Sequence, residues 1–135
     1  MKLASSGLVL GFALLAGTAW AAGTMSPQQI VDDRIAAMKS IIGNLKAVGE
    51  AKDPAEAKAQ LALAIATAEA IPSKFPKGTG PGDAGVTKTR ALPEIWTKSD
   101  EFKADAAALV AALKSASDAA GDAAKFGAAM EAVPK

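Results

Sequence analysis

The chain has 135 residues with a formal net charge of +1; half of them are hydrophobic but only 4% are aromatic. A near-neutral chain lacks the basic surface that nucleic-acid binding requires, so we expect no nucleic-acid partner. The sequence contains no cysteine and no histidine, which excludes disulfides, the usual zinc, copper and iron–sulfur ligand sets, and Ser-His-Asp or Cys-His catalytic groups in these residues. Nor does any convergent pair of carboxylates suggest acid–base catalysis, and we therefore expect a protein that is not an enzyme.

Residues 1–21 have the features of a secretory signal peptide. Lys2 gives a positive start, residues 7–17 form an apolar run, and Ala19-Trp20-Ala21 supplies the small-x-small cleavage pattern. The run is shorter than the roughly 20 residues of a membrane span, so an uncleaved anchor is the weaker alternative. We expect cleavage after Ala21, no stable membrane anchor, and a periplasmic mature protein that forms one domain over residues 22–135.

Capping signals predict a first helix between Ser26 and Gly49. Ser26 can cap the helix, Pro27 suits its first turn, and Gln29 completes a capping box. Apolar residues then recur at spacings of three and four, as on one face of an amphipathic helix. They are Val31, Ile35, Met38, Ile42, Leu45 and Val48. We expect this stripe to be the buried face.

The second predicted helix repeats these signals and leads into a long connection. Asp53 caps it, Glu56 would close the box, and Pro72 ends it because proline lacks the donor that a continuing helix needs. Its apolar face comprises Ala57, Leu61, Ala64, Ile65, Ala68 and Ile71.

Residues 72–93 are rich in glycine and proline, and so long a connection in a small domain is usually functional or a crossover. We expect the flanking helices not to form a simple hairpin contact.

Two further helices complete the predicted fold. The third begins near Thr97 or Ser99 and ends at Gly121, and a fourth starts at Asp122. Their inward faces comprise Phe102, Ala106, Leu109, Leu113 and Ala116, then Phe126, Met130 and Val133. The fourth helix is short, although bundles normally match their helix lengths. The sequence predicts an all-α, up-down four-helix bundle with a truncated fourth helix.

Three segments resemble class II c-type cytochromes, the cytochrome c′ and cytochrome c556 family. Residues 34–39 resemble its Arg-x-x-x-Met-Lys stretch, and residues 88–96, which end in Pro-Glu-Ile-Trp, resemble the start of its third helix. Phe75-Pro76 and the glycines that follow resemble the preceding loop. The resemblance runs from Ser26 to Lys135, and Pro-Glu-Ile-Trp is its most specific part. It implies a cytochrome c′-like bundle that holds haem c, carries electrons to and from periplasmic redox partners, and in many relatives forms a homodimer.

The resemblance also implies how the haem would be attached. The family carries Cys-x-x-Cys-His on its fourth helix, where two thioethers fix the haem and the histidine ligates the iron. Residues 131–135 resemble the lead-in to that motif, but this sequence contains neither residue type. We expect these residues to form no covalent haem link. The alternatives are a haem-free bundle with a structural or interaction role and, less favoured, non-covalent haem held by Met38 alone.

The family's site positions fall on five residues here: Arg34, Met38, Phe75, Thr89 and Arg90. Met38 matches the iron-ligating methionine of the c556 type and is the candidate metal ligand. Without a proximal ligand, a core methionine that fills a packing gap is the favoured interpretation.

For the other four positions the resemblance implies contacts with the haem edge. Arg34 matches an arginine that pairs with a haem propionate; the alternative is a solvated arginine paired with Asp32, Asp33 or a loop carboxylate. Phe75 would pack by the haem or plug the end of the bundle. Thr89 and Arg90 would lie near the haem edge. Pro93 and Trp96 are expected to be structural, as a rigid turn with an aromatic anchor.

Overall fold

The computed structural model describes residues 24–134, so the predicted signal peptide lies outside the described residues. All regular structure within this range is helical, which confirms the all-α prediction. The helices are α1 (Pro27–Glu50), α2 (Pro54–Glu69), the 3-10 turn η1 (Pro72–Lys74), α3 (Glu94–Thr97), α4 (Ser99–Ala119) and α5 (Ala123–Glu131). Within residues 24–134, no helix is both long and apolar enough to cross a bilayer.

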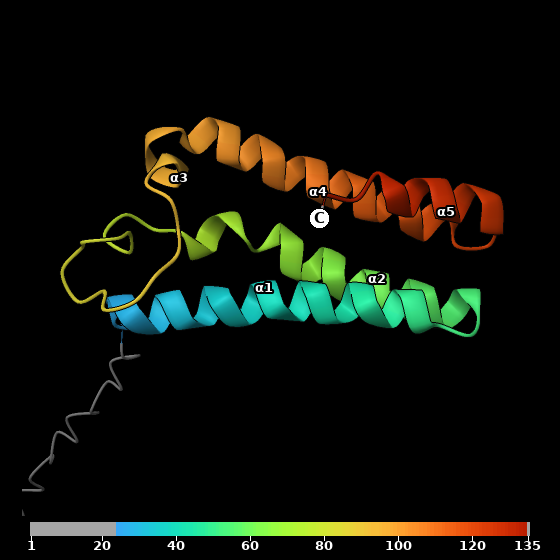
Figure 1. Cartoon of the computed structure of the whole chain (residues 1–135), viewed down its shortest axis with the longest axis horizontal. Helices are drawn as coiled ribbons and strands as arrows, with labels where there is room; N and C mark the ends of the chain where they lie inside the picture. Colours follow the sequence, from blue (N-terminus) through green and yellow to red (C-terminus); the bar gives the residue numbers. More distant parts are fainter. Residues whose placement is uncertain (1–23, 135) are drawn as a thin grey trace, which may run out of the picture.

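Helices α1, α2, α4 and α5 run alternately up and down the long axis of the molecule (Figure 1). α1 packs along α2, α2 against α4, and α4 against α5. Helices α2 and α4, which flank the long loop, therefore pack directly against each other, although the sequence predicted no simple hairpin contact between them. Small buried side chains explain the close approach, because Ala64 and Ala68 of α2 and Ala116 of α4 are all enclosed in the core.

Helix caps set the starts of α1 and α2. The Gln29 amide donates to Ser26 Oγ at 3.2 Å and the Ser26 amide donates to Gln29 Oε1 at 2.7 Å, which confirms the predicted capping box. At α2 the Glu56 amide donates to Asp53 Oδ1 at 2.9 Å. The Glu56 carboxylate, however, accepts from the Lys52 amide at 2.9 Å. The second box is thus only half formed, because Glu56 binds the free amide one residue before the cap.

One predicted boundary differs in the structure. α2 ends at Glu69, and the chain tightens into η1 before Phe75. The third helix begins at Ser99 as predicted, and the short helix α3 precedes it as a separate element, because Lys98 leaves helical geometry with φ −120° and ψ 48°. This break turns the Pro-Glu-Ile-Trp segment back across the end of the bundle.

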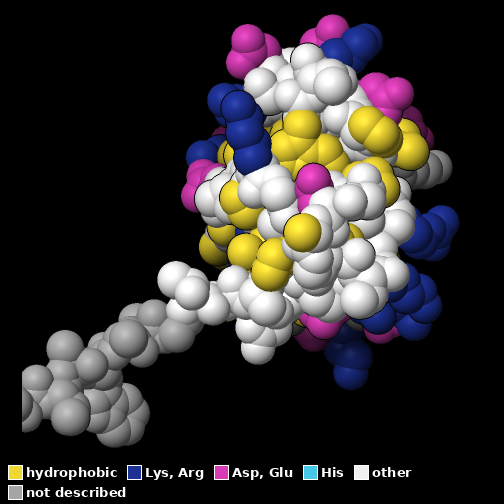
Figure 2. Space-filling view, turned by 90° about the vertical axis from the view of Figure 1, so that its left-hand side faces the viewer, with side chains coloured by type: hydrophobic (Ala, Val, Ile, Leu, Met, Phe, Trp, Pro, Cys, Tyr) yellow, Lys and Arg dark blue, Asp and Glu magenta, His cyan; other side chains and the backbone are white. Residues whose placement is uncertain are grey.

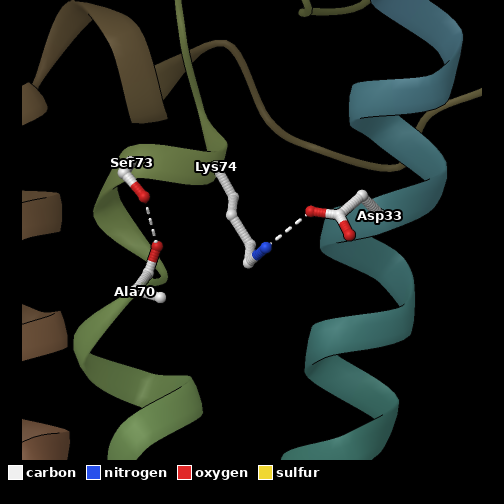
Figure 3. Close-up of polar contacts among 4 residues, drawn as sticks. All are labelled: Asp33, Ala70, Ser73 and Lys74. Carbon is white, nitrogen blue, oxygen red and sulfur yellow. Dashed lines mark hydrogen bonds and ion pairs between the residues drawn. The ribbon is translucent and has the colours of Figure 1, made fainter. Parts of the chain in front are cut away.

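An ion pair fixes η1 to the first helix. Lys74 Nζ lies 2.5 Å from Asp33 Oδ2 of α1, and Ser73 Oγ donates to the Ala70 carbonyl at 2.7 Å (Figure 3). Both charged side chains are partly exposed, so the pair adds only about 0–1 kcal/mol. Its effect is positional, since it holds the start of the long loop beside α1.

The shortness of α5 leaves one side of the bundle open. α5 has 9 residues, whereas α4 has 21. At a rise of about 1.5 Å per residue, α5 is about 13 Å long and α4 about 31 Å long. Its far end lies near the middle of the bundle (Figure 1). Within residues 24–134, α1 and α5 form no interface comparable with the other three. The predicted truncated fourth helix is confirmed, and the first half of α1 faces the gap that it leaves.

The open side changes which face of α1 is buried. Val31, Ala37, Ile41 and Val48 are enclosed, whereas Ile35 and Met38 are each 41% exposed and Ile42 is 67% exposed. The predicted buried stripe was therefore wrong in the middle of the helix. Ile35, Met38 and Ile42 form a second apolar row beside the buried one, and α5 does not reach far enough to cover it.

Candidate functional site

A groove of about 570 Å³ runs along this exposed apolar row. α1 forms one wall, and the end of the long loop with α3 forms the other. Its lining residues are Arg34, Ile35, Met38, Lys39, Ile42, Phe75, Thr89, Arg90, Ala91, Leu92, Glu94 and Ile95. All five residues that the family resemblance selected therefore lie on one groove. Figure 2 shows the loop end of the molecule, where hydrophobic side chains are exposed among charged ones.

Met38 lies between this groove and a second cavity of about 370 Å³. Side chains of α4, among them Phe102 and Leu109, line the second cavity together with Ile71 and Pro134. The favoured interpretation of Met38 as a core residue was wrong, because the side chain is 41% exposed and lines both cavities. The thioether is placed where a ligand in either cavity would meet it.

Arg34 is buried, at 3% exposure, and binds the long loop. Nη1 donates to Thr79 Oγ1 at 3.0 Å, and Nη2 donates to the Thr79 carbonyl at 2.9 Å and to Thr89 Oγ1 at 2.7 Å. The alternative of a solvated arginine paired with a carboxylate was therefore wrong. Thr79 has no counterpart among the predicted site residues, since nothing in a glycine-rich loop marks one threonine as a buried acceptor.

Two aromatic rings enclose the same guanidinium. Its carbon lies 4.7 Å from the centroid of Phe75 and 5.6 Å from that of Trp96, within the range of cation–π attraction. Burial disfavours the charged form and lowers the pKa of Arg34 from its ordinary value. Arg34 forms no ion pair with another residue in the range 24–134. Its hydrogen bonds to Thr79 and Thr89 and the two ring faces offset the cost of burying the charge.

Trp96 anchors the loop, as predicted. Its Nε1–H donates to the carbonyls of Phe75 and Pro76, both at 3.1 Å. Phe75 in turn packs edge-on against Phe102 of α4, with ring centroids 4.9 Å apart. A Cβ at Gly80 would lie 3.1 Å from Asp83 Oδ2 and 3.2 Å from the Trp96 ring, which is tighter than ordinary van der Waals contact, so glycine favours this close approach. The aromatic cluster thus ties the floor of the groove to the bundle core.

Gln28 holds the other end of the loop against α1. Its Oε1 accepts from the Thr87 amide at 2.8 Å and from the Lys88 amide at 3.1 Å. Its Nε2 donates to Asp32 Oδ1 at 2.9 Å and to the Lys88 carbonyl at 3.3 Å. Gln28 was not among the predicted site residues, because an exposed glutamine in a first helical turn carries no distinguishing pattern. With Arg34, it positions residues 87–92 as the second wall of the groove.

The remaining charged lining residues are more accessible. Lys39 and Arg90 are exposed, and neither makes an ion pair with another described residue. Thr89 Oγ1 accepts from Arg34 and, at 3.2 Å, from the Ala91 amide. Glu94 is the one carboxylate in the lining. The groove therefore combines apolar walls with an excess of positive charge.

The side chains of this groove suit a flat, mainly apolar ligand with an anionic edge. Ile35, Ile42 and Leu92 offer apolar surface, and Met38 supplies the groove's only sulfur atom. No group of three or more His, Cys, Asp or Glu side chains within residues 24–134 could hold a metal ion directly. Thioether attachment does not fit, because the 135 residues contain no cysteine. A porphyrin held without covalent bonds does fit.

Comparisons with known proteins agree with this geometry. Residues 29–135 match the family described as Cytochrome C′. The chain is 37% identical over 115 residues to a cytochrome c′ of Pararhodospirillum photometricum, covering 80% of this chain and 89% of the relative. It is 34% identical to a cytochrome c-556 of Agrobacterium fabrum, covering 81% and 70%. The crystal structure of cytochrome c′ from Rubrivivax gelatinosus superposes with a TM-score of 0.69 at 26% identity, covering 82% and 89%.

The fold and the groove define a helical-bundle protein of the haem-binding class. The chain belongs to the cytochrome c′ family, as the matches to the family and to its cytochrome c′ and c-556 members show. Membership implies haem c as the cofactor, and the absence of cysteine agrees with the expected lack of attachment residues.

Proposed function

We propose that this chain is an exported, periplasmic haem protein of the electron-carrier type, not an enzyme, and that these 135 residues hold the porphyrin without a covalent link. The observation that carries the proposal is the convergence of all five family positions on one groove that α5 leaves open. Bound haem would supply an iron centre that exchanges a single electron. These 135 residues contain no cysteine that could form a thioether with the porphyrin.

The residues of the groove have separable roles in this proposal. Ile35, Ile42 and Leu92 would exclude water from the apolar body of the ligand, because they are exposed and line the same groove. Met38 would lie against the porphyrin face, where its thioether is the available soft ligand. Arg34, bound to Thr79 and Thr89, would keep the loop in place.

Titration of the exported protein with haemin tests this function. We expect saturable binding with a shifted Soret band, and acid–acetone should extract all of the haem. I35E places a carboxylate on the apolar wall and should weaken binding about tenfold or more, since an unpaired charge in an apolar contact costs more than 1.4 kcal/mol. L63E is the matched control, because Leu63 is 55% exposed on α2 and lies outside the groove. Equal binding by wild type, I35E and L63E would contradict the proposed site.

Export and assembly are proposals of the same kind. N-terminal sequencing of the periplasmic protein should begin at Ala22, and retention of the full chain in the membrane fraction would contradict cleavage. Small exposed side chains on the first two helices, among them Ala36, Ala62 and Ala66, would permit a homodimer through α1 and α2. Sedimentation velocity should then give twice the monomer mass, and a monomer at all concentrations would contradict the dimer.

A haem-free interaction protein is the second candidate function. The observation in its favour is the absence of the two residue types that bind haem most firmly in this family. The same exposed row on α1 would then contact a protein partner. Failure of haemin to bind at all would favour this function, and saturable binding would exclude it.

A further inference from the structure

We infer that a small cavity beside the aromatic cluster is a second ligand site, which takes a small aromatic carboxylate. The cavity has a volume of about 220 Å³ and lies at the loop end of the bundle, where residues of η1, α3 and the start of α4 line it. It is distinct from the groove on α1, because the two share only Phe75 and Ile95 as lining residues.

Aromatic side chains form one wall of this cavity. Three of the four aromatic residues within residues 24–134 line it, namely Phe75, Trp96 and Phe102. The Phe75 ring centroid lies 4.9 Å from that of Phe102, with the planes at 66°, and 6.1 Å from that of Trp96, with the planes at 58°. All three side chains are partly exposed. Tilted rings of this kind leave faces and edges on which a further aromatic ring can pack.

The volume of the cavity suits a single ring. An apolar cavity of about 150 Å³ holds benzene, so about 220 Å³ leaves room for a benzene ring with a short side chain. A porphyrin is too large for this space. The cavity therefore selects a ligand much smaller than the one proposed for the groove.

The charges around the cavity select an anion. Lys77 and Lys103 line it, and none of its lining residues is a carboxylate. Neither lysine makes an ion pair with another residue in the range 24–134. Aromatic rings also attract cations, but the Arg34 guanidinium already lies over Phe75 and Trp96 and lines the groove instead of this cavity. A second cation would meet only the two lysines.

The start of α4 adds a hydrogen-bond donor. Ser99 lines the cavity, and its hydroxyl can donate to a carboxylate. The acidic residues next to it in the sequence, Asp100 and Glu101, lie outside the lining, and Glu101 binds Lys98 at 3.2 Å. The ligand would place its ring on the aromatic wall and its carboxylate beside Ser99 and the two lysines.

Phenylacetate and phenylacetamide are matched probes for this site, because they have nearly the same shape and differ in charge. Two-dimensional NMR of nitrogen-15-labelled protein reports binding through the indole N–H of Trp96, the only tryptophan in residues 22–135. We expect a saturable shift with phenylacetate and a dissociation constant of about 1 mM, typical of a ligand with about ten non-hydrogen atoms. The amide should bind about fivefold more weakly, as the loss of two exposed ion pairs allows.

Two pairs of variants test the charge and the space separately. K77Q/K103Q should lose the preference for the acid and keep its affinity for the amide. K46Q/K58Q removes two exposed lysines outside the cavity and should retain the preference. S99L should fill the cavity and abolish the shifts with both probes. S115L places the same side chain on an exposed part of α4 outside the cavity and should leave both shifts unchanged.

I35E distinguishes this cavity from the groove. Ile35 lines the groove and not the cavity, so I35E should bind phenylacetate as wild type does. Loss of binding in I35E with binding intact in S99L would place the probe in the groove and overturn the inference. A preference for the acid that survives in K77Q/K103Q, or no saturable shift of the Trp96 resonance in wild type, would also overturn it. Haemin binding is measured separately, so each of these outcomes leaves the proposed function standing.

Discussion

Arg34 binds Thr79 at two atoms, with Nη1 at 3.0 Å from the hydroxyl oxygen and Nη2 at 2.9 Å from the carbonyl oxygen. These residues are 45 positions apart, so the pair joins the first helix to the middle of the glycine-rich loop. Both are buried, and the Thr79 hydroxyl also donates to the Pro76 carbonyl at 2.8 Å. The loop wall of the groove therefore depends on the Arg34 guanidinium.

Removal of this cation should destabilise the fold. R34Q cannot satisfy Thr79 and Thr89 together, so we expect a loss of about 2–3 kcal/mol in the free energy of unfolding, the range for charged hydrogen bonds in buried sites. Urea unfolding measured by circular dichroism gives the value. R90Q changes an exposed arginine and should stay within about 0.5 kcal/mol of wild type. Equal unfolding free energies for R34Q and R90Q would show that the Arg34 contacts do not stabilise the fold.

The register of α1 is tested by two neighbouring isoleucines. Ile41 is 5% exposed and Ile42 is 67% exposed. I41A should cost about 2–5 kcal/mol through the cavity that it leaves, and I42A should cost no more than about 0.5 kcal/mol. Thermal and urea unfolding of the two variants provide the comparison. If I42A destabilised the protein more than I41A, the buried face of α1 would instead be the one predicted from the sequence.

The close packing of the loop on Trp96 is tested at glycines. A Cβ at Gly80 meets the indole ring at 3.2 Å, whereas one at Gly43 in α1 meets nothing within 4 Å. G80A should therefore destabilise by about 1–3 kcal/mol through overpacking. G43A should stabilise by about 0.5–1 kcal/mol, as an exposed helical glycine replaced by alanine does. A melting temperature that rises in both variants would contradict the packing of Trp96 on Gly80.

The Trp96 indole should contribute through its hydrogen bonds as well as its ring. W96F keeps an aromatic ring but removes the N–H that the Phe75 and Pro76 carbonyls share. We expect a loss of about 1–2 kcal/mol in unfolding free energy, from two carbonyls left without this donor. Far-ultraviolet circular dichroism follows unfolding without depending on tryptophan. Stability equal to that of wild type would assign the role of Trp96 to ring packing alone.

Local signals in the sequence predicted the helices well and the buried face of one helix badly. Ser26 and Asp53 mark helix starts, because a cap satisfies amides within the same few residues. The face of α1 that is buried depends on how far α5 extends, which is a property of the whole bundle. An apolar row at Ile35, Met38 and Ile42 has the same spacing whether it meets a core or a groove.

Family motifs pointed to residues that line one groove, whereas residues that hold the loop through long-range contacts were missed. Arg34, Met38 and Arg90 lie in or beside recognisable motifs, and all three line the groove. Thr79 and Gln28 hold the loop through contacts that span 45 and 59 residues. No local pattern encodes such contacts, because they form only once the helices have packed.

Hydrogen–deuterium exchange with and without haemin tests the central claim most directly, that the groove beside the exposed row of α1 is the porphyrin site. We expect slower exchange in residues 34–42 and 89–95 on addition of haemin, with exchange in α2 unchanged. Protection confined to other segments, or no protection at all under saturating haemin, would contradict it.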